Sequence, residues 1–129
     1  MIANIQNLPV RTLCMLAEDD ESTLTYPLPD HIFGFHAQQS CEKLFKALIA
    51  AHGVAYPLTH DLAELMKLLA VHQETLPAVP FDPLLLMPYA VHLRYQYGVG
   101  LTQRERQDIQ ESVVALREYV VARILELER

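Results

Sequence analysis

The stretch from Thr102 to Leu127 constrains the fold of this chain most, because one apolar stripe runs along nearly all of it. The stripe has members at intervals of three and four residues: Ile109, Val113, Leu116, Val120, Ile124 and Leu127. That spacing is typical of one face of an α-helix. Thr102 and Glu105 form a capping-box pattern at its start. We therefore expect one helix of about 26 residues, which at a rise of about 1.5 Å per residue would be about 39 Å long.

Three more apolar residues widen this stripe: Val114, Val121 and Leu125. A face of this width indicates burial on more than one side. A second subunit of a homodimer would provide that burial, and so would neighbouring helices of the same chain. The sequence leaves both arrangements open.

A second apolar stripe lies before Gly53. Its members recur mostly at helical spacing: Phe33, Ala37, Cys41, Leu44, Phe45 and Leu48. Asp30 follows Pro29 and is expected to cap this helix through its side chain. Gly53 is expected to end it, because glycine readily adopts the left-handed conformation that closes a helix.

Shorter patterns predict the remaining elements. Residues 10–18 have helical spacing and end in an acidic run, and the segment 22–29 is expected to be extended because it carries two prolines. Thr59 is expected to cap a third helix whose apolar face consists of Leu62, Leu65, Met66 and Leu69. A short turn at residues 82–83 should lead to a fourth helix over residues 88–96.

The composition agrees with a helical fold. The chain has 129 residues, of which 51% are hydrophobic and only four are glycine, and strand-like alternation is scarce. We predict an all-α protein, an antiparallel up-and-down bundle of four to five helices. It should form a single domain over residues 1–129, with a core over about residues 10–127.

Charge and cysteine content exclude several classes of protein. The net charge of −6 argues against non-specific binding to a nucleic-acid backbone. No apolar run approaches the roughly 20 residues of a membrane span, and the N-terminus lacks the pattern of a signal peptide. Cys14 and Cys41 form no CxxC pair and are expected to be free, buried thiols. We therefore expect a cytoplasmic protein.

Metal and nucleophile motifs are weak. The chain has six histidines but no HxxxH or HExxH pair, so no metal and no cofactor is expected. Five of these residues are expected to be surface or cap residues: His31, His36, His52, His72 and His92. Ser40 lies four residues after His36 but lacks an orienting carboxylate. No glycine-rich phosphate loop occurs.

A set of polar residues lies inside the predicted helices. Gln39, Lys43 and Lys46 share a stripe on the second helix, with Glu42 beside them. His60 and Asp61 open the third helix, and Arg94 and Tyr95 end the fourth. Each has a simple explanation as a solvated, capping or ion-paired residue. If they converge, the lysines, Arg94 and a helix N-terminus would form an anion-binding site.

These residues resemble a motif of the HEPN domain family. Residues 35–48 read FHAQQSCEKLFKAL, which matches the family pattern Gln-x-x-Glu-Lys-x-x-Lys-Ala at Gln39, Glu42, Lys43, Lys46 and Ala47. Residues 57–62 read PLTHDL, which matches a Thr-His-Asp-Leu start of the next helix. The similarity in layout extends over nearly the whole chain.

The resemblance implies a helical bundle that often forms a homodimer. It also implies a toxin–antitoxin-like pairing with a minimal nucleotidyltransferase, and a nucleotide-binding role. Gln39, Lys43, Lys46, His60 and Arg94 would contact the nucleotide or phosphate. The supporting residues would be Glu42, Asp61 and Tyr95. Tyr95 and Tyr97 would be adenylylation targets for the partner.

Other members of the family are metal-independent endoribonucleases that use an arginine and a histidine a few residues later. No histidine follows Arg94 here, because His92 precedes it. The resemblance therefore favours a non-catalytic binding module. Two alternatives stay open: a divergent endoribonuclease that uses Arg94 with His92 or His60 on RNA, and a purely structural dimerisation module.

Overall fold

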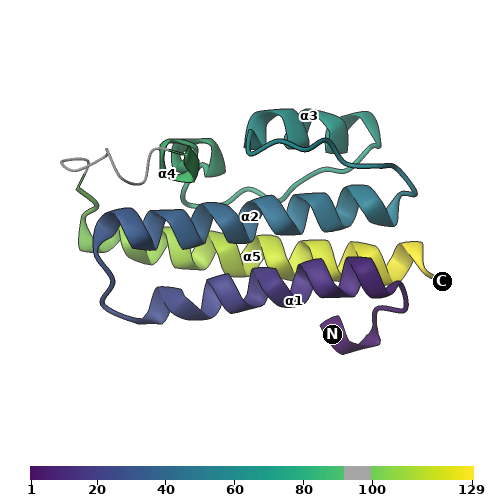
Figure 1. Ribbon diagram of the computed structural model, residues 1–129, viewed down its shortest axis with the longest axis horizontal. Helices are drawn as coiled ribbons and strands as arrows, with labels where there is room; N and C mark the ends of the chain where they lie inside the picture. Colours follow the sequence, from purple (N-terminus) through teal and green to yellow (C-terminus); the bar gives the residue numbers. More distant parts are fainter. Residues whose placement is uncertain (92–99) are drawn as a thin grey trace.

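The computed structural model describes residues 1–91 and 100–129, and every regular element in these two ranges is helical. Three long helices form the body of the molecule: α1 (Leu8–Ser22), α2 (Asp30–Ala51) and α5 (Gln103–Leu127). Two shorter helices, α3 (Leu62–Val71) and α4 (Pro88–Val91), lie on the side of α2 away from α1 (Figure 1). The predicted all-α bundle is confirmed.

Three short 3₁₀ turns complete the described part: η1 (Ile2–Asn4), η2 (Thr23–Thr25) and η3 (Pro83–Leu86). Asp82 caps η3, because its Oδ1 accepts a hydrogen bond from the Leu84 backbone N–H at 3.0 Å. The predicted turn before Pro88 is therefore confirmed. The part of the predicted fourth helix beyond α4 lies outside the described residues.

The direction of the three long helices follows from their connections. α1 runs antiparallel to α2 and α5, whereas α2 and α5 run in the same direction (Figure 1). The starts of α2 and α5 are joined by Asp30, whose carboxylate accepts hydrogen bonds from the Leu101 N–H at 2.9 Å and from Arg106 at 2.8 Å. The predicted up-and-down order therefore applies to α1 and α2 but not to α2 and α5. The segment that carries α3 and α4 returns the chain to the end of the bundle where α2 begins, so α5 runs parallel to α2 (Figure 1).

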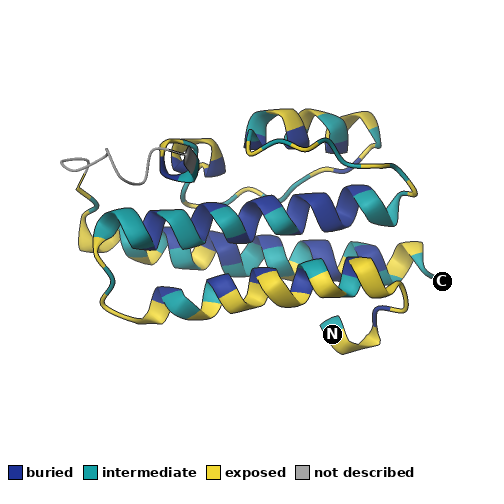
Figure 2. Ribbon diagram, in the orientation of Figure 1, coloured by how far each residue is buried: buried dark blue, intermediate teal, exposed yellow. Residues whose placement is uncertain are grey.

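α2 is the central helix and is buried on most sides (Figure 2). All of its predicted apolar residues are buried: Phe33, Ala37, Cys41, Leu44, Phe45 and Leu48. α5 begins with the predicted capping box at Thr102 and Glu105. Its stripe is buried from Ile109 to Ile124, and only Leu127 at its end is exposed. Cys14 and Cys41 are free and buried, as expected.

Three sequence predictions around α1 and the start of α2 are wrong. α1 extends to Ser22 instead of ending in the acidic run, because Asp20 and Glu21 turn toward partners on α2 and α5. Thr23–Thr25 is a 3₁₀ turn, so the extended segment begins only after it. Asp30 does not cap α2 with its side chain, because its carboxylate is engaged by α5.

The start of α3 also differs from the prediction. Asp61, not Thr59, is the N-cap, and its Oδ1 accepts hydrogen bonds from the backbone N–H groups of Ala63 and Glu64. The Thr59 hydroxyl instead accepts a hydrogen bond from the Asp61 N–H at 3.0 Å. The cap therefore lies two residues later than the sequence suggested.

A buried carboxylate fixes the turn after α3. Glu74 accepts hydrogen bonds from Arg123 and from the Tyr119 hydroxyl of α5, and it lies 2.7 Å from His52 Nε2 at the end of α2. Its side chain has no exposed surface. Burial alone would raise the pKa of Glu74, but the hydrogen bonds from Arg123, Tyr119 and His52 outweigh it and lower the pKa to about 2.

Among the described helices, none has the length and apolar character that crossing a membrane requires.

Candidate functional site

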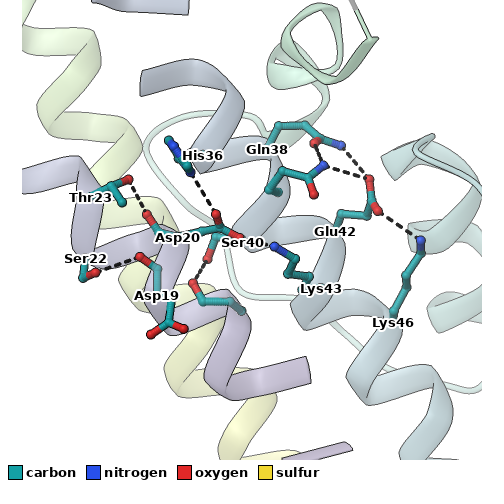
Figure 3. A network of polar contacts seen from close by, with 12 residues as sticks. Asp19, Asp20, Ser22, Thr23, His36, Gln38, Ser40, Glu42, Lys43 and Lys46 are labelled. Carbon is teal, nitrogen blue, oxygen red and sulfur yellow. Dashed lines mark hydrogen bonds and ion pairs between the residues drawn. The ribbon is translucent and has the colours of Figure 1, made fainter. Parts of the chain in front are cut away.

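Three of the polar residues predicted to form a site, Gln39, Lys46 and His60, meet on the carboxylate of Glu42. Its Oε1 accepts hydrogen bonds from Gln38 at 3.2 Å and Gln39 at 3.4 Å, and lies 3.0 Å from His60 Nδ1. Its Oε2 accepts a hydrogen bond from Lys46 Nζ at 3.0 Å. Figure 3 shows Glu42 between Gln38 and Lys46. We call Gln38, Gln39, Glu42, Lys46 and His60 the Glu42 cluster.

Helical spacing on α2 accounts for the contacts of Glu42 with Gln38 and Lys46. Gln38, Glu42 and Lys46 are four residues apart on α2, so their side chains lie above one another on the same face. The contact of Glu42 with His60 comes from the segment before α3. The Gln38 amide also donates to the His60 backbone carbonyl at 3.2 Å, which holds this segment against α2.

The cluster favours the ionised form of Glu42. Burial alone would raise the pKa of Glu42, but hydrogen bonds from Lys46, His60 and Gln38 outweigh it and hold the pKa below its ordinary value of 4.5. The side chain of Glu42 is only 7% exposed. A buried carboxylate that stays ionised can neutralise Lys46 and orient His60 at neutral pH.

His60 is far more exposed than Lys46. Its side chain is 60% exposed, whereas that of Lys46 is 11% exposed. With Nδ1 donating to Glu42, the neutral ring carries its lone pair on Nε2. The site therefore offers a largely exposed imidazole that a buried carboxylate orients.

Lys46 also faces an aromatic ring. Its Nζ lies 5.5 Å from the centroid of the Tyr56 ring, on the segment that leads to His60. Glu42 uses one of the three N–H donors of the ammonium group. The other two donate no hydrogen bond to another described residue.

Lys43 does not join the cluster. Its ammonium group pairs with Asp20 of α1, and His36 Nδ1 lies 2.8 Å from the other oxygen of that carboxylate. Figure 3 shows Lys43 and Asp20 on the side of α2 that faces α1. Lys43 and Lys46 are three residues apart, yet each has its own buried carboxylate, so the structure separates the two predicted lysines.

The remaining predicted residues have different positions. Asp61 caps α3 and is not part of the Glu42 cluster. Arg94 and Tyr95, together with His92 and Tyr97, lie outside the described residues. Ser40 donates a hydrogen bond to the Ala17 carbonyl at 2.9 Å, which accounts for its buried hydroxyl.

Two members of the site were not predicted from the sequence. Gln38 is fully buried and links Glu42 to the His60 backbone. Its position one helical turn before Glu42 could have indicated this contact from the sequence. Nothing in the sequence indicated Tyr56, because its ring reaches Lys46 only through the path of the segment after α2. The described residues contain no group of three or more His, Cys, Asp or Glu side chains suited to a metal ion.

The model of the HEPN domain family matches residues 31–124, which is more than half of the chain. The chain belongs to the HEPN domain family. The resemblance seen in its α2 and α3 motifs is thereby confirmed, and the matched region of this HEPN protein contains the whole Glu42 cluster. No curated protein and no solved structure matches the chain.

Proposed function

We propose that this HEPN protein is a non-catalytic binding module that holds a nucleotide or another phosphate-bearing ligand at Lys46 and His60. The observation that carries the proposal is the meeting of these two side chains on Glu42, although they come from separate segments. Phosphate oxygens accept hydrogen bonds, and both side chains can donate them once His60 is protonated.

The charge of the cluster explains how such a site would work. Glu42 balances the charge of Lys46, so the ligand would be held by directed hydrogen bonds and not by net charge alone. Gln39 and Arg94 complete the proposed ligand set, and Lys43 contributes only at longer range.

We further propose that the protein forms a homodimer and works with a separate minimal nucleotidyltransferase in a toxin–antitoxin-like pair. Membership of the HEPN family supports this partnership. Tyr95 or Tyr97 would then be the residue that the partner adenylylates.

Calorimetric titration with ATP tests the ligand. We expect saturable binding that is weakened in Lys46→Gln and retained in Lys67→Gln, since Lys67 is exposed on α3 and outside the Glu42 cluster. Circular dichroism would check that Lys46→Gln is folded. If the wild-type protein binds no nucleotide at millimolar concentration, the ligand part of the proposal is wrong.

Co-expression with a minimal nucleotidyltransferase encoded beside this chain tests the partner. A stable complex on size exclusion, and an increase in intact mass after incubation with ATP, are the expected results. An unchanged mass in the presence of an active nucleotidyltransferase would contradict the adenylylation of Tyr95 or Tyr97.

The orientation of His60 supports a second candidate, a divergent metal-independent endoribonuclease. A carboxylate that holds Nδ1 while Nε2 faces solvent is the arrangement that a general base requires. RNA cleavage in the presence of a chelator, lost in both His60→Ala and Arg94→Ala, would favour this candidate over the binding module. Cleavage that persists in both variants would discard it.

A further inference from the structure

Two hollows lie along the exposed part of α5. One hollow has Val114 and Ala115 in its lining, and the next has Val121, Ala122 and Leu125; Glu118 lines both. We call these six residues the α5 groove. The second hollow also has Met1, Ile2 and Glu18 in its lining, so it lies where α5 meets α1 and η1. Ala122 and Glu118 are exposed.

The α5 groove carries an excess of negative charge. Glu111 and Glu118 are exposed on α5, and helical spacing places them between the row of Val114 and Val121 and the row of Ala115 and Ala122. Glu18 of α1 also lines the second hollow. None of these three carboxylates forms a hydrogen-bonded ion pair within the described part of the chain, and the nearby Arg117 is bound to Glu21 at 2.7 Å. The carboxylates of α5 therefore lie beside an apolar floor formed by Ala115 and Ala122.

This charge decides which kind of partner fits. An antiparallel α5–α5 contact between two copies would bring Glu111 and Glu118 of one chain against the same carboxylates of the other, and like charges across an interface are unfavourable. Nucleic acid and anionic lipid surfaces carry the same sign and would be repelled. A cationic partner is attracted.

The spacing of the apolar residues in the α5 groove indicates the shape of that partner. Ala115 and Ala122 are seven residues apart, which is two helical turns on the same face. Small side chains at this spacing let a second helix approach closely, while Val114 and Leu125 supply apolar contacts beside them. An amphipathic helix with a narrow apolar seam matches this floor.

We propose that the α5 groove is the docking surface for an amphipathic helix whose apolar seam is flanked by lysine or arginine. The apolar seam packs over Ala115 and Ala122, and the basic residues pair with Glu111, Glu118 and Glu18. The proposal does not depend on the Glu42 cluster.

Fluorescence anisotropy with a defined probe tests the proposal. The probe is a labelled peptide of three Lys-Leu-Ala-Ala-Lys-Leu-Ala repeats, and the control peptide has glutamate in place of lysine. We expect the basic peptide to bind and the acidic one not to bind. In Glu118→Lys the affinity should fall at least about tenfold, since loss of one close pair and gain of a repulsive one exceeds 1.4 kcal/mol.

Matched variants separate docking from general attraction. Glu64→Lys makes the same change of charge on α3, where Glu64 is also exposed, and should alter the affinity by less than about twofold because the charge is remote. Ala115→Leu with Ala122→Leu changes no charge and should weaken binding by blocking close approach.

Three results would overturn the proposal. Equal losses in Glu118→Lys and Glu64→Lys would mean that only overall charge matters. Unchanged binding in the double leucine variant would mean that the floor is not used. A wild-type dimer in sedimentation that this double variant abolishes would assign the α5 groove to a second copy of the chain.

Discussion

Glu42 and Glu74 are both largely buried carboxylates, but their surroundings differ. Glu74 has no exposed side-chain surface, and it is surrounded by Arg123, Tyr119 and His52. Glu42 has His60 as a neighbour, and that ring is mostly exposed. The difference assigns Glu74 to stability and leaves the Glu42 cluster open to a ligand.

Removing the charge of Glu74 should destabilise the protein. In Glu74→Gln, Arg123 loses its buried ionic partner but stays partly exposed and paired with Glu126, so the cost should be about 1.5–3 kcal/mol, the range for a hydrogen bond to a charged group. Denaturant unfolding measures the loss. Glu126→Gln is the matched control, because Glu126 also pairs with Arg123 but is 55% exposed and should contribute about 1 kcal/mol or less. Equal effects of the two variants would contradict the assignment.

The contribution of Glu74 should also be visible in the pH dependence of the unfolding free energy. The pKa of Glu74 is lowered from 4.5 to about 2 on folding, so its stabilising contribution is fully present above the unfolded value. It is lost as the pH falls through the folded value. The difference in unfolding free energy between wild type and Glu74→Gln should therefore be constant above about pH 5 and shrink toward about pH 2. A constant difference over the whole range would contradict this role.

Binding at the Glu42 cluster should depend on the ring of His60. Glu42 holds Nδ1 of this ring beside Lys46, so the ring is placed to contact a phosphate that Lys46 binds. In His60→Leu the affinity for ATP should fall about tenfold, the cost of about one hydrogen bond to a charged group. Calorimetric titration measures the loss, and His72→Leu at the end of α3 is the control. If the two variants bind ATP equally well, His60 does not contact the phosphate.

At the scale of elements, α4 is held by the close approach of one ring to one backbone. The Tyr89 ring lies directly against Gly34 of α2, so that a Cβ at position 34 would overlap it. Gly34→Ala should therefore displace α4 and destabilise the protein by about 1–3 kcal/mol, the usual cost of overpacking. Thermal unfolding measures this.

Gly100→Ala is the control for that variant. Among residues 1–91 and 101–129, a Cβ at position 100 would meet only Asp30 at 3.8 Å, an ordinary contact. Its melting temperature should stay close to that of the wild type. A Gly34→Ala variant as stable as Gly100→Ala would show that α4 is not packed as described.

The elements that the sequence predicted best are those with long repeats. The stripe from Ile109 to Ile124 and its capping box required only helical periodicity, and both are confirmed. The capping residues were harder to predict. Asp30 and Asp61 both have a side chain suited to capping, but only the Asp61 carboxylate accepts hydrogen bonds from the first N–H groups of its helix. The Asp30 carboxylate binds Arg106 of α5 instead, and this contact depends on the tertiary structure.

In the candidate site, as in the fold, contacts within one helix could be predicted from the sequence, and contacts between separate segments could not. The spacing of Glu42 and Lys46 on one helix predicts their pairing, which the structure contains. The sequence placed His60 in the same polar set, but whether it meets Lys46 depends on the path of an irregular segment, which helical spacing does not predict. The separation of Lys43 could not be read from the sequence, because its partner Asp20 is 23 residues away on α1.

At the scale of the whole molecule, α1, α2 and α5 form one core. Cys14 of α1 is 0% exposed and Cys41 of α2 is 1% exposed, and both belong to the same buried cluster as Ile109 of α5. Burial raises the pKa of Cys14 to about 11 and that of Cys41 to about 12. Because the thiolate is the reactive form and both thiols are buried, we expect each to react with a disulfide reagent far more slowly in the folded protein than after unfolding.

This shared burial predicts that both thiols react only when the core opens. If the three long helices unfold together, the two single-cysteine proteins, Cys14→Ala and Cys41→Ala, should be labelled at matching rates once their measured stabilities are taken into account. Adding Glu74→Gln should accelerate both by the same factor, about tenfold for each 1.4 kcal/mol of lost stability. Time-resolved labelling with a chromogenic disulfide measures these rates. Faster labelling of Cys14, with no response to Glu74→Gln, would instead show that α1 detaches while α2 and α5 stay packed.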